Sequence, residues 1–193
     1  MNRDQDIGSA AILAGGESRR MGYDKALLAS RDGGSNLDAL AGSLAARFSD
    51  VFVVRRRGLY EHTQLPRGVR VAYDDMDEPG PMTGVVSAMA NSESKYVFIC
   101  ACDAQPVSPA YLDLLTGLTA ANPRDAVLPR VGGYIQPFWA MYGAHMLPGA
   151  RAAVISGRQS PFRFIQNRDI YIIEENVIAA AGVPASMFSN RNN

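Results

Sequence analysis

The stretch SAAILAGGESRRMGYDK, residues 9–25, decides the fold, because an apolar segment runs directly into a glycine-rich, basic one. The apolar part, SAAILA (9–14), is typical of a strand that is buried on both faces of a sheet. Gly15 and Gly16 then follow at its carboxyl end, where ligands bind in open α/β sheets. Glycine lets backbone N–H groups approach an anion closely, and the nearby arginine and lysine side chains supply positive charge. The stretch therefore predicts a strand followed by a polyphosphate-binding loop.

Neither of the common nucleotide-binding patterns is present. Gly15 and Gly16 are adjacent, so the sequence does not read G-x-G-x-x-G, and no Gly-Lys-Ser/Thr occurs as in a Walker A motif. Two glycines near a few cations would fit an ordinary strand-to-helix turn with solvated charges equally well. The interpretation of this stretch as a polyphosphate-binding loop therefore depends on further motifs elsewhere in the chain.

Outside this stretch, short apolar segments alternate with helical patterns up to about residue 123. We expect strands at VFVV (51–54), VRVAY (69–73) and KYVFICAC (95–102), and helices within 35–48, around 82–89 and after Ser108-Pro109. Either Ser35 or Asn36 is placed to cap the first of these helices. This order predicts an α/β fold with three layers and a doubly wound, mostly parallel sheet.

The pattern changes from about residue 124. DAVLPRVGG (125–133) and IQPFWAMY (135–142) are expected to form two strands joined around Gly132-Gly133, and IYIIEE (170–175) a last strand. Short helices are expected over 148–157 and 160–166. We expect one domain over residues 1–193, with a nucleotide-binding half (about 1–123) and an acceptor-binding part (about 124–193).

The composition excludes several classes of protein. The 19 basic and 19 acidic residues give no net charge, so no global field attracts nucleic acid or an anionic membrane. The amino-terminal residues lack the apolar core of a signal peptide, and no apolar run approaches the ~18 residues of a membrane span. Cys100 and Cys102 are the only cysteines, which favours a buried, reduced pair on one face of a strand over a zinc site. We expect a cytoplasmic protein.

Four motifs together resemble the molybdenum cofactor guanylyltransferase family of nucleotidyltransferases. Residues 13–25 match LAGG-x-S-x-R-M-G-x-D-K, with Ser18, Arg20, Met21, Gly22, Asp24 and Lys25 in register. PGPMTG (79–84), CACDAQPVSP (100–109) and IQPFWAMY (135–142) are similar to three further elements of that family. The resemblance implies a Rossmann-type fold like that of nucleotide-diphospho-sugar transferases.

The resemblance also implies roles for individual residues. In this family the loop backbone holds the nucleotide, a lysine holds the triphosphate, an arginine stabilises charge on the reacting phosphate, and two aspartates contact Mg²⁺ and the nucleotide. Lys25 matches the lysine, Arg20 the arginine, Asp103 the aspartate at the metal and Asp74 the aspartate at the nucleotide. The residues that match the loop backbone are Leu13, Ala14, Gly15 and Gly16. Carboxylate suits Mg²⁺, although Asp103 could instead cap a loop. Asp74 could accept from the guanine amino group or from ribose hydroxyls. Its alternative role is as part of a solvated acidic loop with Asp75, Asp77 and Glu78.

Some positions depart from the family pattern or stay open. Where many members have an asparagine at the end of the second strand, this chain has Val54 and then Arg55–Arg57. We expect these arginines to form a solvated basic turn, with contact to an anionic substrate as the alternative. SMFSNRNN (186–193) resembles the start of F-x-N-x-N-T-P, with Asn190 and Asn192 in place but without Thr-Pro. Arg158 is a candidate contact for an anionic acceptor. Trp139 and Phe138 are expected in the core or a pocket wall, with stacking on a pterin as the alternative.

The resulting hypothesis is an Mg²⁺-dependent guanylyltransferase with GTP and molybdopterin as partners. The terminal phosphate of molybdopterin would attack the α-phosphorus of GTP and release pyrophosphate. The alternatives are a related cytidylyl- or sugar-phosphate nucleotidyltransferase and a non-catalytic GTP-binding accessory protein. Transient contact with other cofactor-biosynthesis proteins or with molybdoenzymes is compatible with the hypothesis.

Overall fold

The computed structural model describes residues 6–14, 35–57, 65–74, 76 and 78–188. Gly15, Gly16, Arg20 and Lys25 lie outside the described residues, as do Asn190 and Asn192. The roles predicted for these six residues therefore stay predictions.

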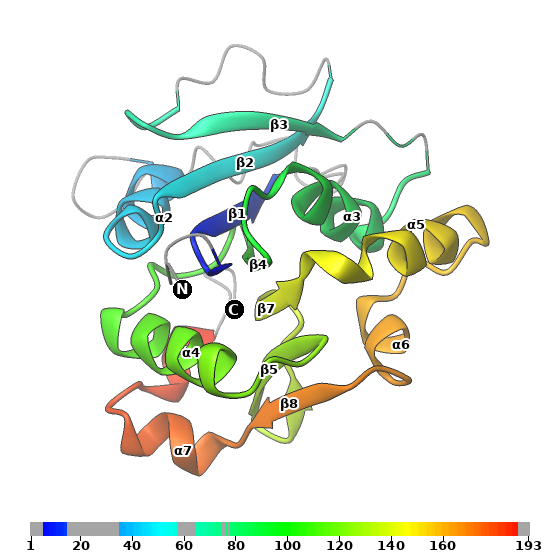
Figure 1. Ribbon diagram of the computed structural model, residues 1–193. Coiled ribbons are helices and arrows are strands. Elements are labelled where there is room, and N and C mark those ends of the chain that lie inside the picture. Colours follow the sequence, from blue (N-terminus) through cyan, green and yellow to red (C-terminus); the bar gives the residue numbers. More distant parts are fainter. Residues whose placement is uncertain (1–5, 15–34, 58–64, 75, 77, 189–193) are drawn as a thin grey trace.

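The described strands form one mixed sheet in the order β3-β2-β1-β4-β7-β5-β6, and β8 also pairs with β5 (Figure 1). Their bounds are β1 (Ser9–Leu13), β2 (Asp50–Arg56), β3 (Arg70–Asp74), β4 (Tyr96–Ala101), β5 (Ala126–Val131), β6 (Tyr134–Ile135), β7 (Trp139–Gly143) and β8 (Ile170–Ile173). The first four strands are parallel, and β1 lies between β2 and β4. The prediction of a mostly parallel α/β sheet is confirmed.

The α-helices of the described residues lie in two layers on the faces of this sheet (Figure 1). One face carries α2 (Asn36–Ala45), α4 (Pro109–Ala121) and α7 (Glu175–Ala180), and the other carries α3 (Pro81–Asn91), α5 (Leu147–Ile155) and α6 (Pro161–Ile165). Alternate residues of β1 divide between these two apolar layers, because Ala10 and Ile12 pack under α2 whereas Ala11 packs under α3. Burial on both faces explains why the strand sequences are continuously apolar.

The helix starts follow the capping residues in the sequence. Ser35 caps α2 in a capping box with Asp38, and the hydroxyls of Ser108 and Ser160 accept from backbone N–H groups at the starts of α4 and α6. α4 and α6 both begin with proline, whose missing N–H costs nothing at that position.

The second half of the sheet differs from the prediction in three details. IQPFWAMY does not form one strand: the β5–β6 hairpin turns at Gly132-Gly133, both with positive φ, and a turn at Gln136–Phe138 precedes β7. β7 then inserts antiparallel between β4 and β5. IYIIEE forms a strand only to Ile173, because Glu174 already caps α7, a helix that the sequence analysis did not predict.

The two cysteines also differ from the prediction. Cys100 is buried in β4, but β4 ends at Ala101, so the half-buried Cys102 lies in the turn that follows. Neither forms a disulfide. Complete burial raises the pKa of Cys100, which keeps this thiol protonated and unreactive.

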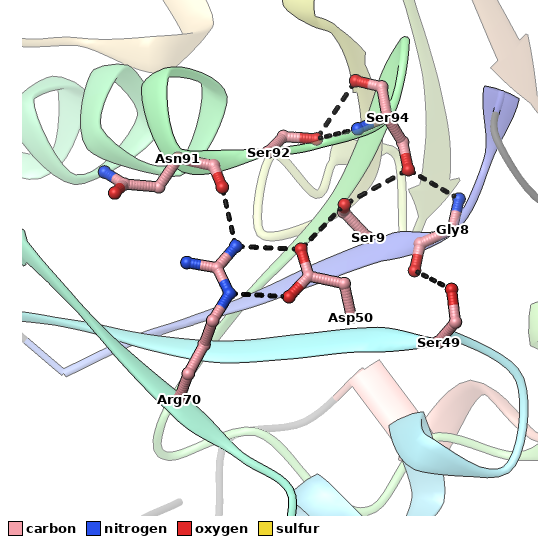
Figure 2. A network of polar contacts seen from close by, with 8 residues as sticks. All are labelled: Gly8, Ser9, Ser49, Asp50, Arg70, Asn91, Ser92 and Ser94. Atoms are coloured by element: carbon pink, nitrogen blue, oxygen red, sulfur yellow. Dashed lines mark hydrogen bonds and ion pairs between the residues drawn. The ribbon is translucent and has the colours of Figure 1, made fainter.

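A polar network joins the strands at the edge of the sheet where the parallel strands begin, which we call the amino edge (Figure 2). Asp50 accepts from Nε and Nη2 of Arg70 at 2.7 and 2.8 Å and from the Ser9 hydroxyl at 3.0 Å. Arg70 also donates to the carbonyl of Asn91 at the end of α3, and the Ser94 hydroxyl accepts from the Gly8 N–H. The network links β1, β2, β3, α3 and the start of β4.

Candidate functional site

The candidate site lies at the opposite edge, the carboxyl edge, where β1, β3 and β4 end. The Ala14 N–H donates to Val54 O at 2.9 Å, and the Cys102 N–H donates to Leu13 O at 3.1 Å. The main chain of Leu13 and Ala14 is thereby joined to β2 on one side and to the residue before Asp103 on the other. The first two residues of the predicted nucleotide loop are thus fixed beside the predicted metal ligand.

Asp103 lies in a tight turn of residues 101–104, which we call the Asp103 turn. The Ala104 N–H donates to Ala101 O at 3.1 Å and closes the turn directly after β4. The Asp103 side chain is half-buried. Within the part of the chain that the structure describes, no residue donates a hydrogen bond to its carboxylate. The described residues thus give no support to the alternative role of Asp103 as a loop cap.

Asn36, which the sequence analysis considered only as a possible helix cap, contacts this turn. It is almost completely buried at the first position of α2, and its side-chain amide donates to Cys102 O at 2.8 Å and to Ala104 O at 3.2 Å. These two carbonyls lie on either side of Asp103. The only signal in the sequence was an amide residue immediately after the Ser35 cap.

Asp74 ends β3 at the same edge and is held by its own neighbours. Its Oδ1 accepts from the Met76 N–H at 3.2 Å and from the Ser87 hydroxyl of α3 at 3.1 Å. These contacts orient the carboxylate, which is therefore part of an organised turn and not of a fully solvated acidic loop. The hydrogen bond from Ser87 is a second contact of the candidate site that sequence reasoning missed.

The PGPMTG motif packs α3 closely against the end of β1. A Cβ on Gly84 would lie 3.1 Å from Cδ1 of Leu13, which is tighter than most real contacts. A Cβ on Gly80, which has a φ of 153°, would lie 2.4 Å from Oε1 of Gln159. The Thr83 hydroxyl donates to Glu78 O and lies 3.4 Å from the same Gln159 oxygen. The positive φ favours glycine at position 80, whereas a larger residue at position 84 would require the Leu13 side chain to shift by a few tenths of an ångström.

This contact also brings the second half of the chain to the candidate site. Gln159 follows α5, so the exposed Arg158 next to it lies beside the start of α3. Arg158 donates from Nε to the Ser156 hydroxyl at 3.0 Å. The structure therefore places Gln159, the residue next to Arg158, against the start of α3, and the acceptor contact predicted for Arg158 stays a prediction.

The prediction of a solvated basic turn after Val54 is wrong for two of its three arginines. β2 continues through Arg55 and Arg56, and Arg55 is buried. The guanidinium of Arg57 lies 4.5 Å and that of Arg55 5.8 Å from the centre of the Tyr73 ring. The strand continues because Arg55 and Arg56 pair with Tyr73 and Asp74 of β3, and the Tyr73 ring packs against part of the Arg55 side chain.

Trp139 is a core residue, as the sequence analysis preferred. It is 4% exposed, and its ring lies 5.3 Å from that of Phe188, while the Tyr111 hydroxyl donates to its carbonyl. Phe138 is half-buried against the layer under α3. Since Trp139 is buried on the α4 side of the sheet, it does not offer a face for stacking on a pterin.

His145, to which the sequence analysis gave no role, pairs with Asp125 at the amino edge, where β5 starts and β7 ends. His145 Nε2 lies 2.8 Å from Asp125 Oδ1, and the Asp169 N–H donates to Asp125 Oδ2 at 3.1 Å. Partial burial acts to raise the pKa of Asp125, but these hydrogen bonds outweigh it and bring the pKa below its ordinary value. This pair lies away from the candidate site.

The described residues can be tested for a fit to Mg²⁺. Between them they contain no group of three or more His, Cys, Asp or Glu side chains that could hold a metal ion. Mg²⁺ does not need such a group, because it is usually bound by one or two carboxylates together with substrate phosphates and water. One half-buried carboxylate, Asp103, beside the main chain of Leu13 and Ala14 fits this mode of binding.

Comparisons with known proteins agree with this arrangement. The sequence profile of the MobA-like NTP transferase domain matches residues 10–170. A protein of Syntrophotalea carbinolica named molybdenum cofactor guanylyltransferase is 31% identical over 187 residues, which cover 96% of this chain and 87% of the relative.

Solved structures show the same fold. Molybdopterin-guanine dinucleotide biosynthesis protein A from Archaeoglobus fulgidus superposes with a TM-score of 0.77 at 18% identity, over 96% of this chain and 92% of the other. A Mycobacterium tuberculosis protein solved in complex with manganese superposes with a TM-score of 0.62 at 15% identity, over 88% of each chain.

Among the described residues, none of the helices has the length and apolar character of a membrane span.

Proposed function

Because the chain belongs to the MobA-like NTP transferase family, we propose that it is an Mg²⁺-dependent guanylyltransferase acting on the molybdenum cofactor. It would transfer GMP from GTP to the terminal phosphate of molybdopterin. An oxygen of that phosphate forms a bond to the α-phosphorus of GTP, the bond from the α-phosphorus to the bridging oxygen breaks, and pyrophosphate leaves. The name of the 31% identical relative supports the choice of nucleotide and acceptor.

The observation that carries this proposal is the position of Asp103. Its turn is hydrogen-bonded to Leu13, one residue before Ala14 and the glycine pair of the LAGG motif. A carboxylate so close to a polyphosphate site would repel the substrate unless a cation lay between them. When bound, Mg²⁺ would neutralise charge on the phosphates and on the leaving pyrophosphate. Asp103 would hold that cation.

The other residues would bind and orient the substrates. Lys25 would hold the triphosphate, and Arg20 would stabilise charge at the reacting phosphate. The main chain of the LAGG motif would hold the nucleotide, and the oriented carboxylate of Asp74 would accept from the guanine amino group or the ribose. Arg158 would contact the anionic acceptor. Positioning and charge neutralisation would thus supply most of the rate enhancement.

The test is pyrophosphate release with molybdopterin and GTP across an Mg²⁺ titration. Asp103→Asn keeps the shape of the side chain but removes its charge, so turnover should fall by orders of magnitude while the fold is retained. Asp113→Asn on α4 is the matched control, because Asp113 is an exposed partner of Arg47 and should turn over like wild type. Wild-type turnover of Asp103→Asn at low Mg²⁺ would show that Asp103 is structural.

The same assay separates the alternatives. A cytidylyl- or sugar-phosphate nucleotidyltransferase would release pyrophosphate only with CTP or with a sugar phosphate. A non-catalytic accessory protein would bind GTP without releasing pyrophosphate under any of these conditions.

A further inference from the structure

We propose that Asn36 is a positioning residue that fixes the Asp103 turn in the geometry needed for metal binding. The inference rests on the metal role proposed above for Asp103. Asn36 is 1% exposed, and it reaches from the start of α2 to a turn 66 residues further along the chain. Nothing in the apolar pattern of α2 requires a polar side chain at this buried position.

The amide of Asn36 must donate to both carbonyls of the turn. Cys102 O and Ala104 O are acceptors only, so the group that faces both of them at 2.8 and 3.2 Å has to be the NH₂. A single planar NH₂ group thus holds the peptide group that precedes Asp103 and the peptide group that follows Ala104. The peptide group between Asp103 and Ala104 is held by the hydrogen bond from the Ala104 N–H to Ala101 O. Together these contacts fix the direction in which the Asp103 Cα–Cβ bond leaves the main chain.

The helix that carries Asn36 is a rigid support. The Ser35 hydroxyl accepts from the Asp38 N–H at 3.1 Å, and Asp38 accepts from the Ser35 N–H at 2.9 Å. Hydrogen bonds from Ser35 lower the pKa of Asp38, so the capping box is held by an ionised carboxylate at neutral pH. The next residues of α2, including Leu37 and Leu40, are buried in the core.

Removing the Asn36 amide should loosen the turn without unfolding the chain. The turn keeps the hydrogen bond from Ala104 N–H to Ala101 O and the bond from Cys102 N–H to Leu13 O. The Val107 N–H also still donates to the Ser43 hydroxyl of α2 at 3.0 Å. Residues that orient a metal ligand typically change metal affinity by about 10- to 100-fold when they are removed.

The experiment measures Mn²⁺ binding by electron paramagnetic resonance, with a non-hydrolysable GTP analogue present. Asn36→Leu has a similar volume and no donor, and it should weaken Mn²⁺ binding by about 10- to 100-fold. Ser94→Ala is the matched control, because it removes the buried acceptor of the Gly8 N–H at the amino edge and should leave Mn²⁺ binding unchanged. Affinity for the GTP analogue without metal should be the same in both variants and in wild type.

A second variant covers the case in which Asn36→Leu does not fold. Asn36→Ser retains one donor and should weaken Mn²⁺ binding to an intermediate extent. If a folded Asn36 variant binds Mn²⁺ as tightly as wild type, the positioning role is wrong and the Asp103 metal site stands. If wild type binds no Mn²⁺ in the presence of the analogue, both the positioning role and the proposed metal site are overturned.

Discussion

Asp50→Ala removes the acceptor at the centre of the network at the amino edge (Figure 2). The change eliminates two charge-assisted hydrogen bonds from Arg70, each worth about 1.5–3 kcal/mol when fully buried. The side chains are 38% exposed for Arg70 and 17% for Asp50, so solvent screening reduces the sum. The Ser9 hydroxyl keeps Ser94 as a partner at 3.2 Å and adds little to the cost. We expect a loss of about 2–3 kcal/mol in the free energy of unfolding.

Thermal and urea unfolding monitored by circular dichroism would measure this loss. For a chain of this size, 1 kcal/mol corresponds to about 2–4 °C, so Asp50→Ala should melt roughly 5–10 °C below wild type. Asp113→Ala breaks a more exposed ion pair with Arg47, at 3.4 Å, and should change the melting temperature by 2 °C or less. GTP affinity at 20 °C should be unchanged, because the network lies at the edge opposite the candidate site. A melting temperature within 2 °C of wild type for Asp50→Ala would refute the reasoning.

Three further predictions concern the nucleotide, the lysine and acid stability. GTP with Mg²⁺ should raise the melting temperature more than CTP, UTP or ATP. At a GTP concentration of 100 times the dissociation constant, binding adds about 2.7 kcal/mol to the free energy of unfolding. Equal shifts for all four nucleotides would contradict guanine selectivity. Lys25→Ala should weaken GTP binding roughly 10- to 100-fold by calorimetry without changing the circular dichroism spectrum, and wild-type affinity would argue against its contact with the triphosphate. Since the folded pKa of Asp125 lies below its unfolded value, the ionised carboxylate stabilises the fold above about pH 4, and this contribution is lost as the pH falls through the folded pKa. The melting temperature of wild type should therefore exceed that of Asp125→Asn at pH 7, and the difference should shrink below pH 4; a constant difference would contradict this.

The alternation of strands and helices along the chain, and with it the layered α/β fold, could be predicted because it depends on local patterns. Continuous apolar strands, the i, i+3, i+4 pattern of α2 and the Ser-Pro starts of α4 and α6 all act within a few residues. The insertion of β7 between β4 and β5 could not be predicted, because the aromatic and apolar residues of β7 do not indicate which strands it pairs with.

The candidate site, like the fold, could be predicted only in part. Asp74 and Asp103 could be placed at one edge, because each directly follows a strand predicted from the sequence, over 69–73 and 95–102 respectively. The contacts of Asn36 and Ser87 could not, because each joins a helix to a turn from another part of the chain. The burial of Arg55 was missed for a similar reason, since it depends on Tyr73 in the adjacent strand.

The antiparallel insertion of β7 has a consequence for synthesis on the ribosome. β4 ends at residue 101, but the strand that covers its outer edge ends about 40 residues later, at Gly143. At about 5–20 residues per second, the unpaired backbone of YVFICA would wait roughly 2–8 s for its partner. An apolar strand with a free edge is a template for pairing with other chains. The nascent polypeptide therefore exposes this apolar edge to aggregation, and to binding by chaperones, between the emergence of β4 and that of β7.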